Sequence, residues 1–435
     1  MVSSDAQTQP IYGHKLSTVG PGTVTGETAV YDFTDTDLLM KLHYLRGVYY
    51  FKGGDDGSSS PVSGLNTAAL KGPTFPLFDT YTSASGRIRR RTSDGSGGGR
   101  PYVKCNDCGV RVVEAKCDRT VEEWVKEKGP WLHHAQLAPV NVVGPELQFS
   151  PLIFIQLTRF KCGGLAIGLG WSHILGDAFS AANFVNKWGR LVSGEKLPLE
   201  PQHLIEPKPK PEKPRKTSVD SVKEVSPVED CWVVPNESKM ETFSFQITPP
   251  KLNHLLSEVK QSHRCYSAFE AISAVIWQCL APKKITICRT DTSSSNRYRL
   301  MSNNQTLSTI EADFPVAEAK LPKLAELIAR ETADESEAAG GLVNAESGLP
   351  DFIVYGANLT FVDLAGIEFY GFEMKGQKPV AVNYSVDGVG DGGAVLVLPA
   401  GGGGGGDGGR VVTATLPVEQ AVRLQSELER EWGIA

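Results

Sequence analysis

The sequence predicts an α/β fold, or an α+β fold with mixed sheets, divided into two domains. The chain has 435 residues, and a single hydrophobic core seldom grows past about 250–300 residues. Patterns typical of strands and of helices occur together in both halves. Residues 201–229 are rich in proline and charge and poor in apolar side chains, which predicts a linker. We therefore expect domains at 1–200 and 230–435, joined by a crossover linker at 201–229.

The N-terminal half contains strand patterns and one long helix pattern. Residues 178–192 predict the helix, because their large apolar side chains recur at helical spacing. In the strand before it, residues 165–171, larger side chains alternate with glycine or alanine. This alternation gives one bulky face and one bare face, and a backbone or ligand can approach the bare face closely. The other predicted strands are 48–51, 110–113 and 152–157.

The C-terminal half contains two helix patterns and a hairpin. Residues 267–280 are strongly apolar, so we expect a largely buried helix that starts with a capping box. Residues 417–432 predict an amphipathic helix that begins at a proline. Residues 401–409 are almost all glycine and predict a long hairpin loop. The two strands of this hairpin are 394–398 and 411–416.

Composition excludes several classes of protein. The formal net charge is -6, from 44 basic and 50 acidic residues, which argues against a nucleic-acid binder. No apolar run approaches the roughly 20 residues of a membrane span, and the N-terminus lacks the apolar region of a secretory signal. We expect a cytoplasmic protein without a transmembrane segment. The eight cysteines are irregularly spaced, which favours reduced thiols, and Cys105 and Cys108 lack the second ligand pair of a zinc site, so no metal is expected.

The segment 163–180 contains the strongest candidate for chemistry. His173 follows a predicted strand and precedes a helix, a position where polar groups face a crevice in α/β folds. An imidazole there suits general-base catalysis, since its ordinary pKa lies near neutrality. The alternative is a hydrogen-bonded structural histidine. Asp177 either orients the imidazole or caps the following helix and pairs with an arginine, for which Arg289 is a candidate.

Several segments carry a resemblance that extends over nearly the whole chain. His173 and Asp177 form a His-x-x-x-Asp motif after a glycine-rich strand. Together with CNDCGVRVVEA (105–115), SAFEAISAVIW (267–277) and GAVLVLP (393–399), this motif resembles the plant BAHD acyltransferase family. Within it, longer matches resemble the wax-synthesis branch, the Eceriferum and Glossy type proteins. These matches lie at 40–53, 104–117, 160–181, 355–364 and 383–391.

The resemblance implies a fold, a substrate and a mechanism. The fold is the two-domain CoA-dependent acyltransferase fold, of the chloramphenicol-acetyltransferase type, with a channel between the domains that reaches the histidine from both ends. His173 takes a proton from an acceptor hydroxyl or amine, which then attacks the thioester of an acyl-CoA. Asp177 holds the loop. Acyl-CoA is then a co-substrate, no cofactor stays bound, and the protein is a monomer.

One departure from the family leaves two hypotheses open. Catalytic members carry Asp-Phe-Gly-Trp-Gly before Lys-Pro, a motif usually interpreted as structural. Here Lys378 and Pro379 are present, but 373–377 reads EMKGQ, and only the acid Glu373 keeps its character. The wax-synthesis branch shares such departures and assists very-long-chain fatty-acid elongation for cuticular wax. The chain is therefore either an acyltransferase that uses His173, or a non-catalytic partner of the elongase condensing enzyme at the cytosolic face of the endoplasmic reticulum.

Overall fold

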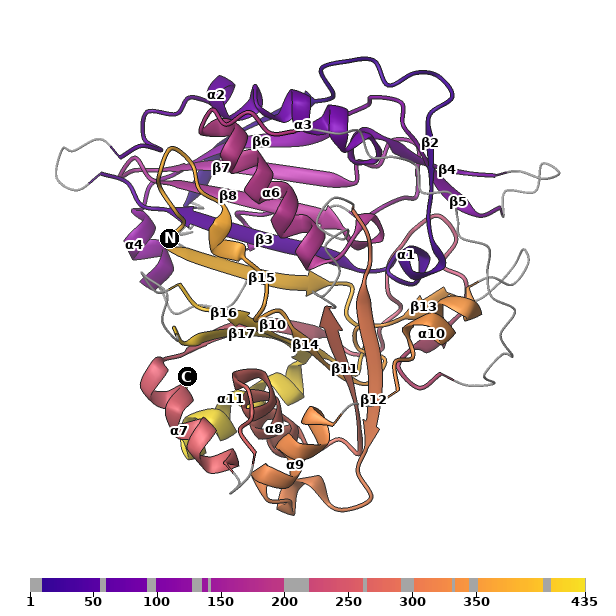
Figure 1. Ribbon diagram of the computed structural model, residues 1–435, viewed down its shortest axis with the longest axis vertical. Helices are drawn as coiled ribbons and strands as arrows, with labels where there is room; N and C mark the ends of the chain where they lie inside the picture. The colour runs from indigo at the N-terminus through magenta and orange to yellow at the C-terminus, as the bar shows by residue number, and fades with distance from the viewer. Residues whose placement is uncertain are drawn as a thin grey trace, which may run out of the picture.

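The computed structural model describes residues 10–54, 60–91, 99–126, 135–139, 142–198, 219–260, 264–290, 301–330, 333–343, 351–401 and 408–434. Two six-stranded sheets lie one above the other in Figure 1 and form the framework of the molecule. Both sheets are mixed, because each contains parallel as well as antiparallel strand pairs. This arrangement confirms the predicted α/β class.

The first sheet is built mostly from the N-terminal half. Its helix α6 (Ala178–Val192) lies across one face, and its large apolar side chains face the core, as the helical spacing predicts. The short helices α2 (Thr67–Lys71) and α3 (Thr74–Thr80) lie on the same side in Figure 1. The strand order is β1 (Ile11–Val19), β6 (Val110–Cys117), β7 (Ile153–Phe160), β8 (Leu165–Ser172), β3 (Tyr44–Phe51) and β15 (Ala381–Asp387).

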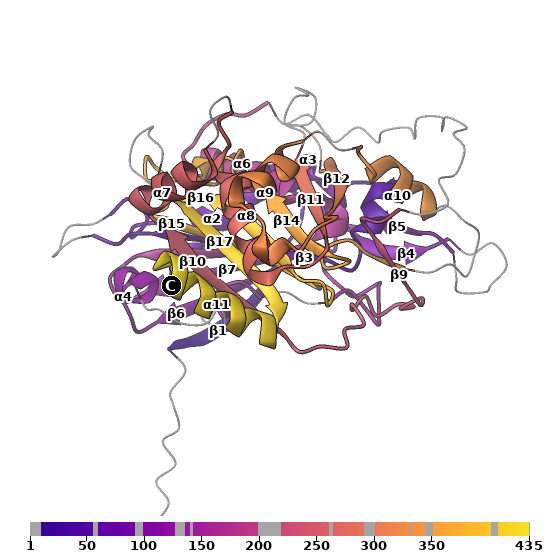
Figure 2. The ribbon, with the colours of Figure 1, turned by 90° about the horizontal axis from the view of Figure 1, so that it is seen from below.

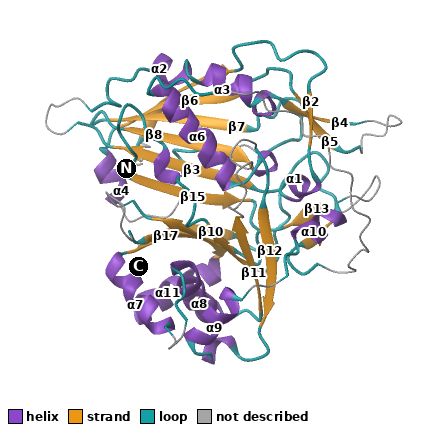
Figure 3. Ribbon diagram, viewed as in Figure 1, coloured by secondary structure: helices purple, strands orange, loops and turns teal. Residues whose placement is uncertain are grey.

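The second sheet belongs to the C-terminal half and has its own helical layer. Figures 2 and 3 show α7, α8, α9 and α11 together over its outer face, where they enclose a separate hydrophobic core. The bounds are α7 (Pro249–Val259), α8 (Ala268–Leu280), α9 (Leu321–Ala329) and α11 (Val418–Trp432). The strand order is β10 (Met240–Ile247), β17 (Arg410–Pro417), β16 (Ala394–Pro399), β14 (Leu359–Asp363), β11 (Lys284–Thr290) and β12 (Gln305–Glu311).

Smaller elements complete the described part of the chain. Among them, α1 (Asp35–Leu39) contacts α10 (Ser336–Leu342) from the other half of the sequence. Helix α4 (Val121–Lys126) lies beside the first sheet. The remaining strands are β2 (Val30–Asp32), β5 (Pro101–Lys104) and β4 (Arg87–Arg90) in one sheet, and β9 (Lys223–Val225) with β13 (Asp351–Ile353) in another.

Most of the predicted elements are confirmed. The four N-terminal strand predictions correspond to β3, β6, β7 and β8, and the three helix predictions to α6, α8 and α11. Helix α8 begins with the expected capping box, in which Ser267 accepts from the Glu270 backbone and Glu270 accepts from the Ser267 backbone. Strands β16 and β17 pair antiparallel, as the glycine-rich hairpin prediction requires.

One strand crosses between the two halves of the chain. Strand β15 comes from the C-terminal half but pairs antiparallel with β3 at the edge of the first sheet. The pairing is fixed by packing that the local sequence does not reveal, because the Tyr384 ring fills the space over Gly47, where an added Cβ would lie 2.5 Å from it. Of the predicted linker, residues 201–218 lie outside the described residues, and the remainder includes β9.

None of the helices in the described part of the chain is long and apolar enough to cross a membrane.

Candidate functional site

His173 lies where the two halves of the chain meet. It follows β8 and opens a 3-10 turn, His173–Leu175, and its backbone N–H donates to the His43 carbonyl at 3.0 Å. Its side chain has 0% exposure. The groups that contact the imidazole come from the C-terminal half: Asn303, Gln305 and Tyr355.

Asn303 determines which ring nitrogen of His173 carries the proton. The Asn303 amide nitrogen donates to Asp37 Oδ1 and to the His173 carbonyl, both at 2.9 Å. The amide oxygen therefore faces His173 Nδ1, at 2.9 Å. Since an amide oxygen only accepts, we assign the proton to Nδ1 and leave a lone pair on Nε2. This is the tautomer that a base acting through Nε2 requires.

The Tyr355 hydroxyl occupies that lone pair. It lies 3.0 Å from His173 Nε2 and accepts from the Gln305 amide at 3.2 Å. Its own proton is therefore directed at the imidazole, which accepts more strongly than the Cys288 thiol, the other group bonded to the phenol. The nitrogen that would take a proton from a substrate is thus already hydrogen-bonded inside the protein.

A second buried histidine holds the Tyr355 backbone. His43 Nδ1 donates to the Gly388 carbonyl at 2.7 Å, so its Nε2 accepts from the backbone N–H groups of Val354 and Tyr355, at 3.1 and 3.4 Å. The Tyr355 ring lies between the two imidazoles, with centroids 4.9 Å from His43 and 5.4 Å from His173. The tyrosine is 2% exposed and is fixed at both ends.

Burial controls the protonation of both imidazoles. Desolvation lowers the pKa of His173 to about 4, an effect partly offset by its hydrogen bond with Asn303. Desolvation, reinforced by His173, lowers the pKa of His43 to about 3. Both rings are therefore neutral at pH 7. A neutral imidazole can accept a proton, but so low a pKa makes it a weak base.

Asp177 is the N-cap of α6. Its Oδ1 accepts from the Ser180 backbone at 2.9 Å, and its Oδ2 accepts from the Asn304 backbone at 3.3 Å. Burial outweighs these hydrogen bonds and raises the pKa of Asp177 to about 6. Of the two sequence interpretations, capping describes this geometry, whereas His173 is oriented by Asn303.

The arginine suggested as a partner of Asp177 points elsewhere. The Arg289 guanidinium donates to the Ile328 carbonyl at 3.0 Å and lies 3.7 Å from the Glu270 carboxylate. The alternation along β11 explains the error, because the sequence places Arg289 in a strand without showing which face of the sheet it occupies. Within the described residues, backbone N–H groups contact the Asp177 carboxylate and no guanidinium does.

The altered second motif lies at the far end of α6 from His173. Met374 and Gln377 bridge a tight turn, and the backbone N–H of Lys375 donates to Ser193 Oγ at 2.7 Å. Glu373 belongs to this turn, Pro379 is buried and Lys378 is exposed. Because α6 has 15 residues, the turn is about 22 Å from Asp177 along the helix. The structure does not bring Glu373, Lys378 and Pro379 to the imidazole.

No pattern in the sequence indicates the groups around His173. Tyr355 lies inside a matched stretch, 355–364, and nothing in its spacing indicates contact with a histidine 182 residues away. Gln305 begins β12 and Asn303 lies two residues before it, 132 and 130 residues from His173. Only an alignment of many relatives, with paired changes at these positions, could have indicated such contacts.

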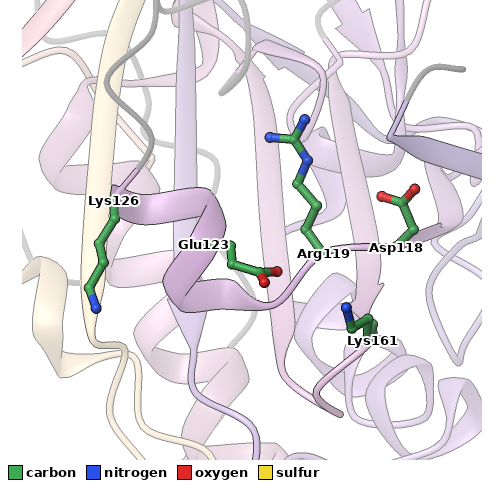
Figure 4. A pocket seen from close by; sticks show the side chains of 5 residues that line it. All are labelled: Asp118, Arg119, Glu123, Lys126 and Lys161. Atoms are coloured by element: carbon green, nitrogen blue, oxygen red, sulfur yellow. The ribbon is translucent and has the colours of Figure 1, made fainter. Parts of the chain in front are cut away.

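A surface hollow of about 660 Å³ lies away from this site. It is lined by Asp118, Arg119, Glu123, Lys126 and Lys161 (Figure 4). Lys161 precedes β8 and His173 follows it, so the eight-residue strand separates the two by about 26 Å. The basic and acidic side chains that line the hollow face solvent, and none of them contacts the His173 imidazole.

The described residues contain no group of three or more histidine, cysteine, aspartate or glutamate side chains arranged for a metal ion. Cys105 is buried, Cys108 is exposed, and both are free thiols.

Comparison with known proteins identifies the family. A model of the Transferase family matches residues 32–294, more than half of the chain. Protein ECERIFERUM 26-like from Arabidopsis thaliana is 40% identical over 97% of this chain and 96% of its own length. The chain belongs to the BAHD transferase family.

Other relatives agree with this BAHD assignment. Protein ECERIFERUM 26 and Protein ECERIFERUM 2 from the same plant are 37% and 36% identical, each over at least 96% of both chains. The BAHD fold is confirmed by vinorine synthase, with a TM-score of 0.70 at 17% identity over 97% of this chain and 98% of that one. TRI101 of F. graminearum, complexed with ethyl coenzyme A, has a TM-score of 0.65 at 13% identity over 93% and 98%.

Proposed function

We propose that this BAHD protein acts in very-long-chain fatty-acid elongation for cuticular wax, as a non-catalytic accessory partner of the elongase condensing enzyme. The near full-length identity with three ECERIFERUM proteins supports the wax-synthesis branch. That branch implies a role in elongation, and the altered turn at 373–377 is the departure its members share.

One observation carries the non-catalytic part of the proposal. The imidazole of His173 has 0% exposure. The lone pair on its Nε2 accepts a hydrogen bond from the Tyr355 hydroxyl at 3.0 Å. General-base catalysis requires hydrogen-bond reach between the base and the proton of the substrate. Here a side chain of the protein holds that position, so an acceptor hydroxyl or amine has no access to Nε2.

Acyl-CoA remains the ligand that we expect. TRI101, which has the same fold, forms a complex with ethyl coenzyme A. A growing acyl-CoA is the ligand that we expect an elongase partner to bind. We propose that the protein works at the cytosolic face of the endoplasmic reticulum, as a monomer associated with the condensing enzyme. In this role the two sheets supply a stable framework and His173 supplies structural hydrogen bonds.

A second candidate function is acyl transfer with His173 as the base. The tautomer favours it, because Asn303 leaves the lone pair on Nε2. His173 would remove a proton from the acceptor, the acceptor oxygen or nitrogen would attack the thioester carbonyl, and coenzyme A would leave as the thiol. Such a reaction needs Tyr355 to be displaced. Purified protein given long-chain acyl-CoA with alcohols or amines would then form product that His173→Ala abolishes.

The proposal is tested by restoring chain length in plant cells that lack the protein. Cells receive the wild type, His173→Ala or, as a matched control, His254→Ala, whose side chain is 61% exposed on α7. Wax chain length is measured by gas chromatography and normalised to the amount of protein. We expect all three to restore the longest chains equally.

A further variant shows that the assay depends on the fold. Gly47→Leu places a side chain in the space of the Tyr384 ring, 2.5 Å from the Cβ position, and we expect it to restore nothing. Loss of long chains in His173→Ala, at wild-type protein abundance, would refute the accessory role and favour acyl transfer.

A further inference from the structure

Tyr355 fills the place beside His173 that a reacting molecule would need. Its hydroxyl is within hydrogen-bond distance of Nε2, and its ring fills the space between two imidazoles. Within the described part of the chain, two buried oxygens near this hydroxyl have no hydrogen-bond partner. They are the oxygen of the Gln305 amide that supports it and the Ser172 hydroxyl, next to His173 in the sequence. Buried polar groups of this kind are uncommon in native proteins and indicate a strained or functional position.

We propose that Tyr355 is a built-in plug of the His173 base, and that the site behind it keeps a latent acyl-CoA hydrolase activity. This inference rests on the proposed function, since it explains why a BAHD chain with His173 and Asp177 in place does not turn over. The phenol imitates the hydroxyl of a substrate but is fixed and cannot leave.

The plug is rigid because its backbone is held on both sides. His43 accepts from the N–H groups of Val354 and Tyr355, and the Tyr355 carbonyl accepts from the Gly390 N–H at 2.9 Å. Gly356 follows with φ +90°, and a Cβ there would lie 2.3 Å from the Gly390 carbonyl oxygen, so the turn tolerates only glycine. A tyrosine anchored in this way is not a lid that opens during turnover.

The base behind the plug is intact. Asn303 orients the ring independently of Tyr355, through its bonds to Asp37 and to the His173 carbonyl. Removal of the phenol would leave space for a water molecule beside Nε2, where the Gln305 amide nitrogen, at 3.4 Å, remains the one described contact. Asn303 and Gln305, which contact the ring, are 7% and 6% exposed. The imidazole is therefore covered by side chains that themselves reach the surface only slightly.

The latent reaction is the hydrolysis of a thioester. His173 Nε2 takes a proton from water, and the hydroxide oxygen bonds to the thioester carbonyl carbon. The carbon–sulfur bond then breaks, and the sulfur receives the proton from the imidazolium. The products are a fatty acid and coenzyme A thiol, and no other reactant is required.

The test measures release of coenzyme A thiol from hexanoyl-CoA and palmitoyl-CoA by the purified full chain. We expect Tyr355→Ala to release thiol at least about 100-fold faster than the wild type, the lower end of what a positioned base contributes. The increase should disappear in the double variant Tyr355→Ala with His173→Ala. Tyr355→Phe keeps the ring and removes only the hydroxyl, so it should stay at the wild-type rate because the space remains filled.

Folding is monitored by circular dichroism, and Tyr355→Leu, which keeps more apolar volume, replaces the alanine variant if that variant is unfolded. Phenol added to the cavity variant should inhibit thiol release and raise its melting temperature, with no effect on the wild type. A folded cavity variant without thiol release, or a release that survives loss of His173, would overturn the plug and leave the elongation role untouched. Loss of chain-length rescue in His173→Ala would instead overturn the non-catalytic role in elongation.

Discussion

His173 and Asp177 are both buried, and their pKa values move in opposite directions. Burial lowers the pKa of His173 from 6.5 to about 4, so between these values the unfolded chain binds more protons and stability falls as the pH is lowered. Burial raises the pKa of Asp177 from 3.8 to about 6, so between these values the folded chain binds more protons and stability falls as the pH rises.

Two substitutions distinguish the capping role of Asp177 from the effect of its buried charge. Asp177→Asn keeps a side-chain oxygen for the Ser180 N–H and removes the buried charge, so the free energy of unfolding at pH 7 should change by less than about 1 kcal/mol. Asp177→Ala removes the cap and should lower it by about 1–2 kcal/mol. Urea unfolding at pH 7 measures both. Equal, large losses in the two variants would show that the carboxylate charge holds the loop.

At the scale of single residues, the sequence predicted the local position of a residue between a strand and a helix. It did not predict contacts between residues that are far apart in the chain. The position of His173 after a strand and of Asp177 before a helix follows from patterns within 20 residues. Asn303 and Tyr355, which decide the chemistry of the imidazole, reach it across 130 and 182 residues. Neither residue belongs to a periodic pattern that indicates a contact with His173. The hydrogen bond between the Tyr355 hydroxyl and His173 Nε2 could therefore not be predicted.

Helix α6 connects the two parts of the family signature, because Asp177 caps its start and the turn at 373–377 packs against its last turns. Gly189 allows this packing, since a Cβ there would lie 2.5 Å from the Glu373 carbonyl oxygen and 2.8 Å from the Phe372 ring. We predict that Gly189→Ala lowers the free energy of unfolding by about 1–3 kcal/mol, the cost of overpacking.

The matched control for this prediction is Gly341→Ala on α10, where an added Cβ meets nothing within 4 Å. Alanine there should leave stability unchanged or raise it by up to about 1 kcal/mol, because alanine favours the helix. Chemical denaturation measures the free energy of unfolding of both variants. If Gly189→Ala behaves like the control, the turn and the helix do not pack as closely as described.

Whole elements were predicted well where their own periodicity specifies them. Helices α6, α8 and α11 and the hairpin β16–β17 have clear patterns, since their apolar faces are defined by the segment itself. The place of strand β15 in the first sheet could not be predicted, because the choice between two sheets depends on Tyr384 packing over Gly47 and Tyr49. Such a choice is a property of the assembled core.

At the scale of the molecule, the two halves depend on each other through β15. The strand pairs with β3 along seven residues, and Arg46 and Asp387 form an ion pair across it. We predict that residues 1–218 expressed alone do not fold cooperatively, because the edge of β3 and the core around Tyr49 remain uncovered. Co-expression with residues 219–435 should recover a folded complex. Cooperative thermal unfolding of 1–218 alone would contradict this dependence.

The titration of His173 shows whether its imidazole is enclosed by Tyr355, because an enclosed imidazole and an accessible one titrate at different pH. In protein labelled with ¹⁵N-histidine, its signals are identified by their loss in His173→Gln. We expect a proton on Nδ1 and a ring that stays neutral down to about pH 5, since burial lowers its pKa to about 4. A midpoint near the ordinary value of 6.5, with the proton on Nε2, would show an accessible imidazole and contradict the account.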